Sequence, residues 1–268
     1  GMSCPNPRTT GQGLRVGLLG MADNSATKVL LQELNNYGYP PDVAFLLQPS
    51  FKIQLTRLFR KLKASGLRAT LLRVIYAISS KKIKKDKPTD QSTFLPSELY
   101  FVDSVNGKDC RSKIKAANLD LLLLSVDCLV GSGTFSLPKC GTLNAHPGWI
   151  PAYRGLGSTL CMVRDGFLPS ISVHIVDEGI DTGPVILRET IKADAATVGG
   201  KGELYSLHSQ AKMFSKVIGM YETGEVEFID TFFEPSNMTR GISNRDAVHI
   251  RKKNEKKLDR LKPVDHLN

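Results

Sequence analysis

Residues 14–20, LRVGLLG, and residues 21–34, MADNSATKVLLQEL, together predict a strand, a loop and a helix at the start of the fold. The first stretch is short, apolar and partly β-branched, which is typical of a buried strand. In the second stretch Asp23, Asn24 or Ser25 can cap the helix, because a side-chain oxygen at this position accepts a hydrogen bond from the first helical turn. The loop between them therefore follows the carboxyl end of a strand.

Three further apolar runs of strand length follow this unit. They span residues 42–48, 99–103 and 119–125, and residues 111–117 form a predicted helix between the last two. Fully apolar runs that alternate with helices indicate a parallel sheet covered on both faces. We therefore expect an α/β fold with a doubly wound, mostly parallel sheet.

The second half of the chain continues the sheet and then turns helical. Residues 141–146 predict another strand, and residues 171–177 alternate in polarity as a strand does. Residues 185–191 are expected to pair with this strand through the turn-rich stretch EGIDTG at 178–183. Residues 203–221 predict a long helix, and residues 246–261 predict a short charged one.

A basic segment interrupts the rhythm of strands and helices. Residues 51–90 hold 12 Lys or Arg against two Asp, whereas the net charge of the whole chain is +10. Apolar residues at helical spacing between 51 and 80 predict two amphipathic helices hinged near residues 65–66. We expect a catalytic domain over 14–222 with a basic helical insertion at 51–95, followed by a short C-terminal extension at 223–268.

Composition and cysteine usage indicate a globular protein of a reducing compartment. The chain has 268 residues, 41% hydrophobic and 23% charged, which is in the globular range. Its five cysteines show no CxxC pair and no histidine at metal-ligand spacing, so we expect neither a disulfide framework nor a metal site. The polar N-terminus and the absence of a long apolar run predict a cytoplasmic protein.

The stretch GTLNAHPGWIPAYRG carries the candidate chemistry. Asn144 and His146 are two residues apart in an extended segment, so both side chains leave the same face. Pro147 disfavours the helical region for His146 and keeps it at the end of a strand, where active sites of open α/β sheets lie. An amide that can bond an oxyanion beside an imidazole that can move a proton suits acyl transfer. By this spacing alone, a turn asparagine and a structural histidine are the preferred interpretation.

The whole match is more specific than the pair, because LNAHPGWIPAYRGLGS followed by SVHIVDEGIDTGPVI resembles the folate-dependent formyltransferase family. The resemblance covers about residues 98–191 and loosely the first strand and helix. It implies a doubly wound sheet and a catalytic set of Asn144, His146 and Asp181. The alternative for Asp181 is a carboxylate that only closes the DTG turn. His174 corresponds to a histidine that lines the site in many members, with a core histidine as the alternative.

The resemblance also implies binding residues for two substrates. Residues 125–133 lie where members contact the pterin of 10-formyltetrahydrofolate, although the arginine common near Leu129 is missing here. The residues expected to bind this co-substrate are Leu129, Gly131, His174, Asp177 and Gly179. Those expected to bind the acceptor are Asn24, Ser25, Arg154 and Gly155, with Ser158 as a cap of the next helix. An ordinary surface arginine is the alternative for Arg154.

On this interpretation a neutral amine attacks the formyl carbon, and Asn144 and protonated His146 stabilise the oxyanion. Asp181 is expected to hold the imidazole or a relay water and to keep the pKa of His146 near its ordinary value of about 6.5. The partners expected are folate and a small-molecule amine, without DNA or a membrane surface, and a homodimer stays open.

The acceptor is ranked by resemblance and by length. An amino sugar on a nucleotide comes first, because TLNAHPG and SVNGKD look most like members with that acceptor. Glycinamide ribonucleotide comes second. Methionyl-tRNA comes third, because too few residues follow position 222 for a further C-terminal domain. The alternative from another class is a non-catalytic scaffold that binds an anionic partner through the basic insertion.

Overall fold

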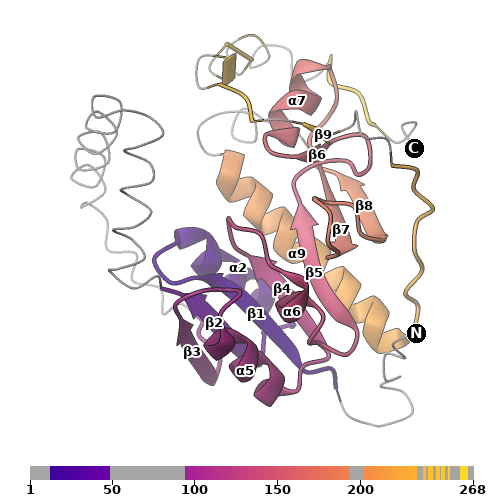
Figure 1. The fold of residues 1–268 in the computed structure, drawn as a ribbon. Coiled ribbons are helices and arrows are strands. Elements are labelled where there is room, and N and C mark those ends of the chain that lie inside the picture. Colours follow the sequence, from indigo (N-terminus) through magenta and orange to yellow (C-terminus); the bar gives the residue numbers. More distant parts are fainter. Residues whose placement is uncertain are drawn as a thin grey trace, which may run out of the picture.

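A seven-stranded sheet forms the centre of the protein, as seen in a computed structural model (Figure 1). The structure describes residues 13–48, 94–192 and 202–233, together with short stretches between 238 and 264. The strand order is β3-β2-β1-β4-β5-β7-β8. The strands are β1 (Val16–Met21), β2 (Val43–Leu47), β3 (Glu98–Val102), β4 (Leu121–Ser125), β5 (Gly141–His146), β7 (Ser170–Ile175) and β8 (Val185–Thr190).

Six strands of this sheet point in one direction, and β7 runs in the opposite direction. The pairs from β3 to β5 are all parallel, whereas β5 pairs with β7 and β7 with β8 antiparallel. The order in which successive strands are added to the sheet reverses between β1 and β4. Ligands bind outside the carboxyl ends of strands near such a reversal. The predicted fold class and the predicted pairing of the last two strands are confirmed.

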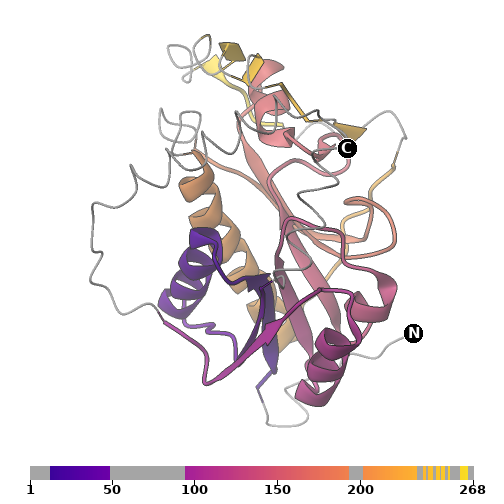
Figure 2. The same ribbon diagram turned by 60° about the vertical axis from the view of Figure 1, so that its left-hand side comes forward.

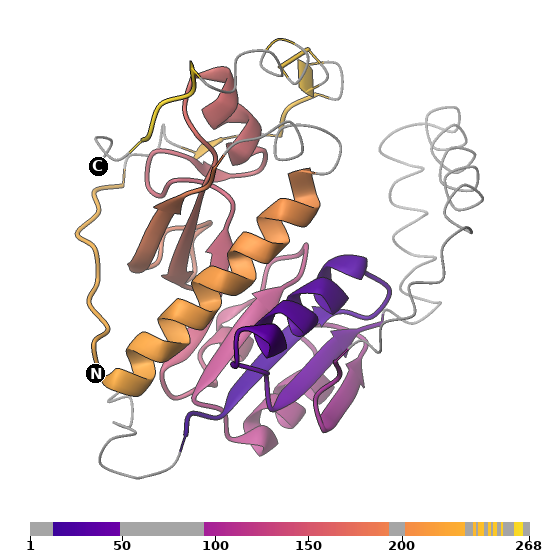
Figure 3. The same ribbon diagram turned by 180° about the vertical axis from the view of Figure 1, so that it is seen from behind.

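Helices cover both faces of the sheet. Helices α2 (Ser25–Asn36) and α9 (Gly202–Thr223) lie side by side on one face, as Figure 3 shows from behind. Helices α5 (Lys108–Ala117) and α6 (Ser132–Phe135) cover the other face, and Figure 2 shows the sheet between the two layers. Helix α7 (Ser158–Arg164) lies beyond the end of β5.

Each face of the sheet has its own apolar core. The first core joins β1, β4, β5 and β7 to α2 and α9, with the fully buried Phe214 from α9. The second joins β2 and β4 to α5 around the fully buried Phe45. Burying apolar surface on both faces is what makes the central strands apolar throughout.

Segments after residue 223 return to the region around α7. Strand β9 (Met238–Thr239) pairs in parallel with β6 (Arg154–Gly155). Val264 is fully buried in a cluster that includes Trp149 and Tyr153. The described parts of the predicted extension therefore contact the predicted catalytic domain, while the domain boundaries stay predictions.

Other predictions about the chain have mixed outcomes. The two helices of the basic insertion and most of the predicted helix at 246–261 lie outside the described residues.

Cys110, Cys128 and Cys161 are free, but Cys140 is in a disulfide bond, so the expectation of reduced cysteines is not met there. Within the described ranges, helices long and apolar enough to cross a membrane are absent.

The cap of α2 is Asn24, one of the three candidates from the sequence. Its Oδ1 accepts a hydrogen bond from the Ala26 N–H at 2.9 Å. We expect Asn24→Ala to lower the free energy of unfolding by about 1 kcal/mol, because one N–H of the first turn loses its partner. Urea unfolding measures this change, with Asn24→Ser as the control that keeps a capping oxygen. Equal stability of the alanine and wild-type proteins would contradict the cap.

Candidate active site

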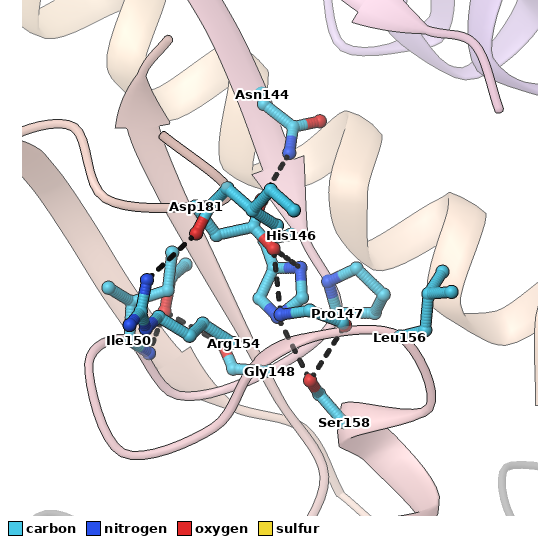
Figure 4. A network of polar contacts seen from close by, with 12 residues as sticks. Asn144, His146, Pro147, Gly148, Ile150, Arg154, Leu156, Ser158 and Asp181 are labelled. Atoms are coloured by element: carbon cyan, nitrogen blue, oxygen red, sulfur yellow. Dashed lines mark hydrogen bonds and ion pairs between the residues drawn. The ribbon is translucent and has the colours of Figure 1, made fainter. Parts of the chain in front are cut away.

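The three residues predicted to be catalytic meet at the carboxyl end of β5 (Figure 4). Asn144 and His146 project from β5, and Asp181 lies in the loop between β7 and β8. The Oδ1 atom of Asp181 is 3.4 Å from Asn144 Nδ2, and its Oδ2 atom is 3.2 Å from His146 Nδ1. The shared face predicted for Asn144 and His146 therefore meets one carboxylate.

Asp181 holds an unusual backbone conformation. Its φ is 52°, in the left-handed region that residues with a Cβ seldom adopt. The Gly155 N–H donates to Asp181 Oδ2 at 2.9 Å and helps to hold the carboxylate in place. Backbone strain of this kind is often concentrated at functional sites. Asp181 thus also contacts residues outside its own turn, and its catalytic role stays a prediction.

His146 is buried, and both of its ring nitrogens face acceptors. Its side chain is 6% exposed. Nδ1 faces the Asp181 carboxylate, and Nε2 lies 3.1 Å from the Tyr153 carbonyl and 3.2 Å from Ser158 Oγ. We assign the neutral ring its hydrogen at Nδ1, because the opposite tautomer would point a lone pair at the carboxylate.

The electrostatics of His146 differ from the expectation. Burial lowers the pKa of His146, and it outweighs the charge of Asp181, which raises that pKa. The expected ordinary value near 6.5 is therefore wrong, because a buried imidazolium loses its hydration. The neutral ring is the resting form at neutral pH.

Asp181 stays ionised beside this ring. Burial alone would raise the pKa of Asp181, but contacts with His174, His146 and the Gly155 N–H together bring that pKa well below its usual range. The site therefore holds a carboxylate next to a neutral imidazole, an arrangement that can accept a proton.

Asn144 also contacts His174, across the strand pair. The two residues are register partners on β5 and β7, and Asn144 Nδ2 is 3.3 Å from His174 Nε2. His174 Nδ1 lies 2.8 Å from the Ile175 carbonyl, and its Nε2 is also 3.5 Å from Asp181 Oδ1. His174 is 2% exposed. It is therefore both buried and in contact with the predicted catalytic set.

Glycine is required at position 148, directly after the His-Pro pair. A Cβ there would lie 2.4 Å from the Tyr153 carbonyl oxygen and 2.6 Å from His146 Nε2. Only a residue without a side chain allows this close approach. Gly148 therefore lets the following loop fold back over the imidazole.

The loop at 154–158 was predicted to contact the acceptor. Arg154 is 8% exposed, so the alternative of a surface arginine is wrong, and its Nη1 donates to the Ile180 carbonyl at 3.2 Å. The predicted cap at Ser158 is also wrong. Gly157 is the N-cap of α7, and Ser158 Oγ instead contacts His146 and the Gly155 carbonyl. Binding of an acceptor by Arg154 and Gly155 stays a prediction.

The loop predicted to contact the pterin is held by Asn106. The Asn106 amide donates to the Leu129 carbonyl at 3.0 Å, and its oxygen accepts from the Gly131 N–H at 2.7 Å. The Leu129 carbonyl and the Gly131 N–H therefore already have a hydrogen-bond partner in Asn106. This role of Asn106 was not predicted from the sequence. The Leu129 side chain is 74% exposed at this position.

The remaining predicted binding residues mainly support local structure. Asp177 Oδ1 accepts from the Gly179 N–H at 3.1 Å and from Thr182 Oγ1 at 2.7 Å, which closes the loop that carries Asp181. Asn24 and Ser25 are exposed at the start of α2, two strands away from β5. Their contacts with ligands stay predictions.

Two residues of the site gave no clear signal in the sequence. Ser158 was expected only as the cap of the following helix, and Thr239 lies 58 residues beyond Asp181 in a stretch of weak pattern. Thr239 Oγ1 is 2.9 Å from Ser158 Oγ. In the part of the chain that the structure describes, groups of three or more metal-ligating side chains are absent.

Comparison with known proteins gives one family and a consistent fold. A family model described as "Formyl transferase" matches residues 45–215, more than half of the chain. Methionyl-tRNA formyltransferase from Thermotoga maritima is 23% identical over 155 residues, which are 56% of this chain and 50% of that protein. The corresponding protein from Alkaliphilus oremlandii is 27% identical over 110 residues, or 41% and 36%. The chain thus spans half or less of these relatives.

Solved structures share the fold at low sequence identity. Glycinamide ribonucleotide transformylase 1 from Symbiobacterium toebii has a TM-score of 0.52 at 18% identity, covering 87% of this chain and 96% of that one. A sugar N-formyltransferase from a Shewanella species also has a TM-score of 0.52, at 12% identity, covering 89% and 86%. At these identities the likeness concerns the fold alone.

Proposed function

Because the chain belongs to the formyl transferase family, we propose that it transfers a formyl group from 10-formyltetrahydrofolate to a primary amine. The observation that carries this proposal is the contact of one carboxylate, Asp181, with both Asn144 and His146 at the end of β5. Groups that can stabilise an oxyanion and move a proton are what formyl transfer requires.

Asn144 is the proposed donor to the oxyanion. When the amine nitrogen forms its bond to the formyl carbon, the carbonyl electron pair moves onto oxygen. The Asn144 amide makes only long contacts with Asp181 and His174, at 3.4 and 3.3 Å, so one of its hydrogens can turn to this oxygen. Contacts of this length often shorten only when the reacting complex forms.

Asp181 is the proposed proton acceptor, and His146 holds it in place. Asp181 is 14% exposed and His146 6%, so the carboxylate is the group closer to the substrate. Its Oδ1 atom receives the proton that the attacking amine loses, directly or through a water molecule, while the N–H at His146 Nδ1 keeps donating to Oδ2. When the carbon–oxygen double bond re-forms, the bond to the leaving nitrogen breaks and that nitrogen takes up the proton. This path places His146 behind Asp181. It differs from the expectation from the sequence, in which protonated His146 stabilises the oxyanion.

The surroundings of the site fit a folate donor, which supplies the formyl carbon. Leu129, Leu156 and Ile180 are exposed at 74%, 75% and 42%, and such apolar side chains suit a flat aromatic ring system. Leu129 and Leu156 follow neighbouring strands β4 and β5, and Ile180 precedes Asp181. The predicted folate-binding residues therefore remain in our proposal, with Leu156 and Ile180 added.

The identity of the acceptor amine is a more specific part of the proposal. An amino sugar on a nucleotide stays first, supported by the resemblance of residues 104–109 and 142–148 described above. The names of the sequence relatives support methionyl-tRNA as the second acceptor, ahead of glycinamide ribonucleotide. In each case the reacting group is a primary amine, so the chemistry at Asn144 and Asp181 is the same.

Release of tetrahydrofolate from 10-formyltetrahydrofolate, followed by absorbance with a panel of the three acceptors, tests the proposal. Turnover that depends on one acceptor would support it and identify the substrate class. If every acceptor fails and calorimetry detects no folate binding, the formyltransferase proposal is overturned. The alternative of a scaffold whose basic segment binds an anionic partner would then come first.

Asn144→Ala should lower kcat by about 10²- to 10³-fold, the usual effect of removing one oxyanion donor. KM for the amine should change little, because the interaction strengthens only in the transition state. Steady-state kinetics with the active acceptor measure both constants. Asn36→Ala, an exposed asparagine of α2 that bonds to Glu33, is the matched control. A tenfold loss or less in Asn144→Ala would assign the oxyanion to another group.

A further inference from the structure

Ser158 lies on the side of the His146 ring opposite to Asp181 (Figure 4). Its Oγ is 3.2 Å from His146 Nε2, and Asp181 Oδ2 is 3.2 Å from Nδ1. Ser158 is only 2% exposed. A carboxylate, an imidazole and a hydroxyl thus form one continuous buried chain that extends away from the substrate side.

The His146 Nε2 atom needs a hydrogen-bond donor, and the Ser158 hydroxyl can be that donor. The neutral ring carries its hydrogen at Nδ1, so Nε2 must accept a hydrogen bond. The Tyr153 carbonyl, 3.1 Å from Nε2, can only accept. The Ser158 hydroxyl can donate to Nε2, and it therefore supplies what the neutral ring needs.

The same hydroxyl has a second place for its hydrogen. The Gly155 carbonyl lies 2.9 Å from Ser158 Oγ. When His146 gains a second proton, its new N–H can donate to the Tyr153 carbonyl while the Ser158 hydrogen turns to Gly155. Both protonation states of the buried ring are then satisfied, with the rotation of one hydroxyl and little movement of heavy atoms.

Thr239 holds Ser158 from the C-terminal part of the chain. Its Oγ1 is 2.9 Å from Ser158 Oγ and also contacts the carbonyls of Arg154 and Leu156, at 2.8 and 3.1 Å. Strand β9 brings it there by pairing Thr239 with Gly155. Residue 239 lies outside the range that matches the family model, 45–215.

We propose that Ser158, held in place by Thr239, is a positioning residue that donates to Nε2 of the neutral His146 ring and so keeps the ring hydrogen at Nδ1, facing Asp181. Its effect on rate rests on the proposed formyl transfer, whereas its effect on the ring does not. The charged and titratable groups that face His146 are Asp181 and His174, both near its Nδ1 side. Ser158 and Thr239 contribute neutral hydroxyls on the other side.

Nuclear magnetic resonance of the His146 ring tests the proposal without any turnover. Long-range proton–nitrogen spectra report the tautomer and the titration midpoint, and the His146 signals are those missing from His146→Ala. In Ser158→Ala the neutral ring loses its donor at Nε2, so we expect the midpoint to rise by about one pH unit. Ser215→Ala is the control, because Ser215 is also buried and also bonds a carbonyl, that of Ala211.

Thr239→Val gives a second, independent variant. It keeps the shape of the side chain but frees the Ser158 hydroxyl to rotate away from Nε2. We expect a smaller rise of the midpoint, a fall in kcat of about tenfold, and an unchanged KM for the amine. Thr239→Ser should restore the wild-type values, and Thr223→Val is the control for loss of a threonine hydroxyl elsewhere.

The outcomes separate this inference from the proposed function. A raised midpoint in Ser158→Ala and Thr239→Val supports the role of the hydroxyls, even if every acceptor fails and formyl transfer is abandoned. A midpoint and a tautomer that equal those of the wild type in both folded variants overturn the inference, even if the enzyme transfers formyl groups. If Ser158→Ala does not fold, Thr239→Val and Thr239→Ser decide by the same measurement.

Discussion

Asp181→Asn should lower kcat by about 10³-fold with the fold intact. The amide cannot hold the proton that the attacking amine releases, and general acid–base groups contribute about 10²- to 10⁴-fold. Asparagine tolerates the left-handed φ of 52° better than most residues, and its oxygen can still accept from the Gly155 N–H. Steady-state kinetics and circular dichroism at pH 7 measure both parts of this expectation.

The control for this variant is Asp109→Asn, which removes an exposed aspartate paired with Lys113 on α5. It should leave kcat unchanged. An activity of Asp181→Asn within tenfold of the wild type would mean that the carboxylate carries no proton in the reaction.

Asp181 should also make stability depend on pH in a defined direction. Its pKa is lower in the folded protein than the ordinary value of about 3.9, so the unfolded chain takes up the proton first as the pH falls. The stabilisation is present above about pH 4 and is lost as the pH falls toward the folded pKa. Unfolding free energies of wild type and Asp181→Asn should therefore converge in acid.

His146→Ala should lower kcat by about 10²- to 10⁴-fold. The substitution removes the N–H that holds the Asp181 carboxylate, and Ser158 and Tyr153 lose their contact with Nε2. The same kinetic assay measures the loss. His208→Ala, which removes a half-exposed histidine paired with Glu33, should keep full activity.

The histidine variant should also change how stability responds to pH. Burial lowers the folded pKa of His146, so below about pH 6.5 the unfolded state binds a proton that the folded state does not. The wild type therefore loses stability as the pH falls from 7.5 to 5.5. His146→Ala should lose less over that range in urea unfolding. A steeper loss in the variant would mean that the folded protein favours the charged ring.

The fold could be predicted from the sequence because its elements are encoded locally. Apolar runs such as residues 121–124 favour buried strands, and the pattern after residue 20 specifies a helix with a cap. The cap itself was predicted only as one of three residues, since the choice of Asn24 depends on the path of the loop. The basic insertion lies outside the described residues and stays a prediction.

The candidate site was predictable only in part. Period-two geometry places Asn144 and His146 on one face of β5, and the resemblance to a family pointed to Asp181. Ser158 was misassigned as a cap, because its partners belong to residues 146 and 155 and not to its own helix. Sequence spacing carries no information about such contacts.

The sequence by itself determined the layers of the fold and the pair Asn144 and His146, since both follow from short-range periodicity. Only the tertiary structure decided that Asp181 meets them, that Thr239 reaches Ser158 from 81 residues away, and that the pKa of His146 is lowered. These features depend on which distant segments exclude water from the ring. Desolvation is a property of the packed molecule, and no stretch of chain encodes it alone.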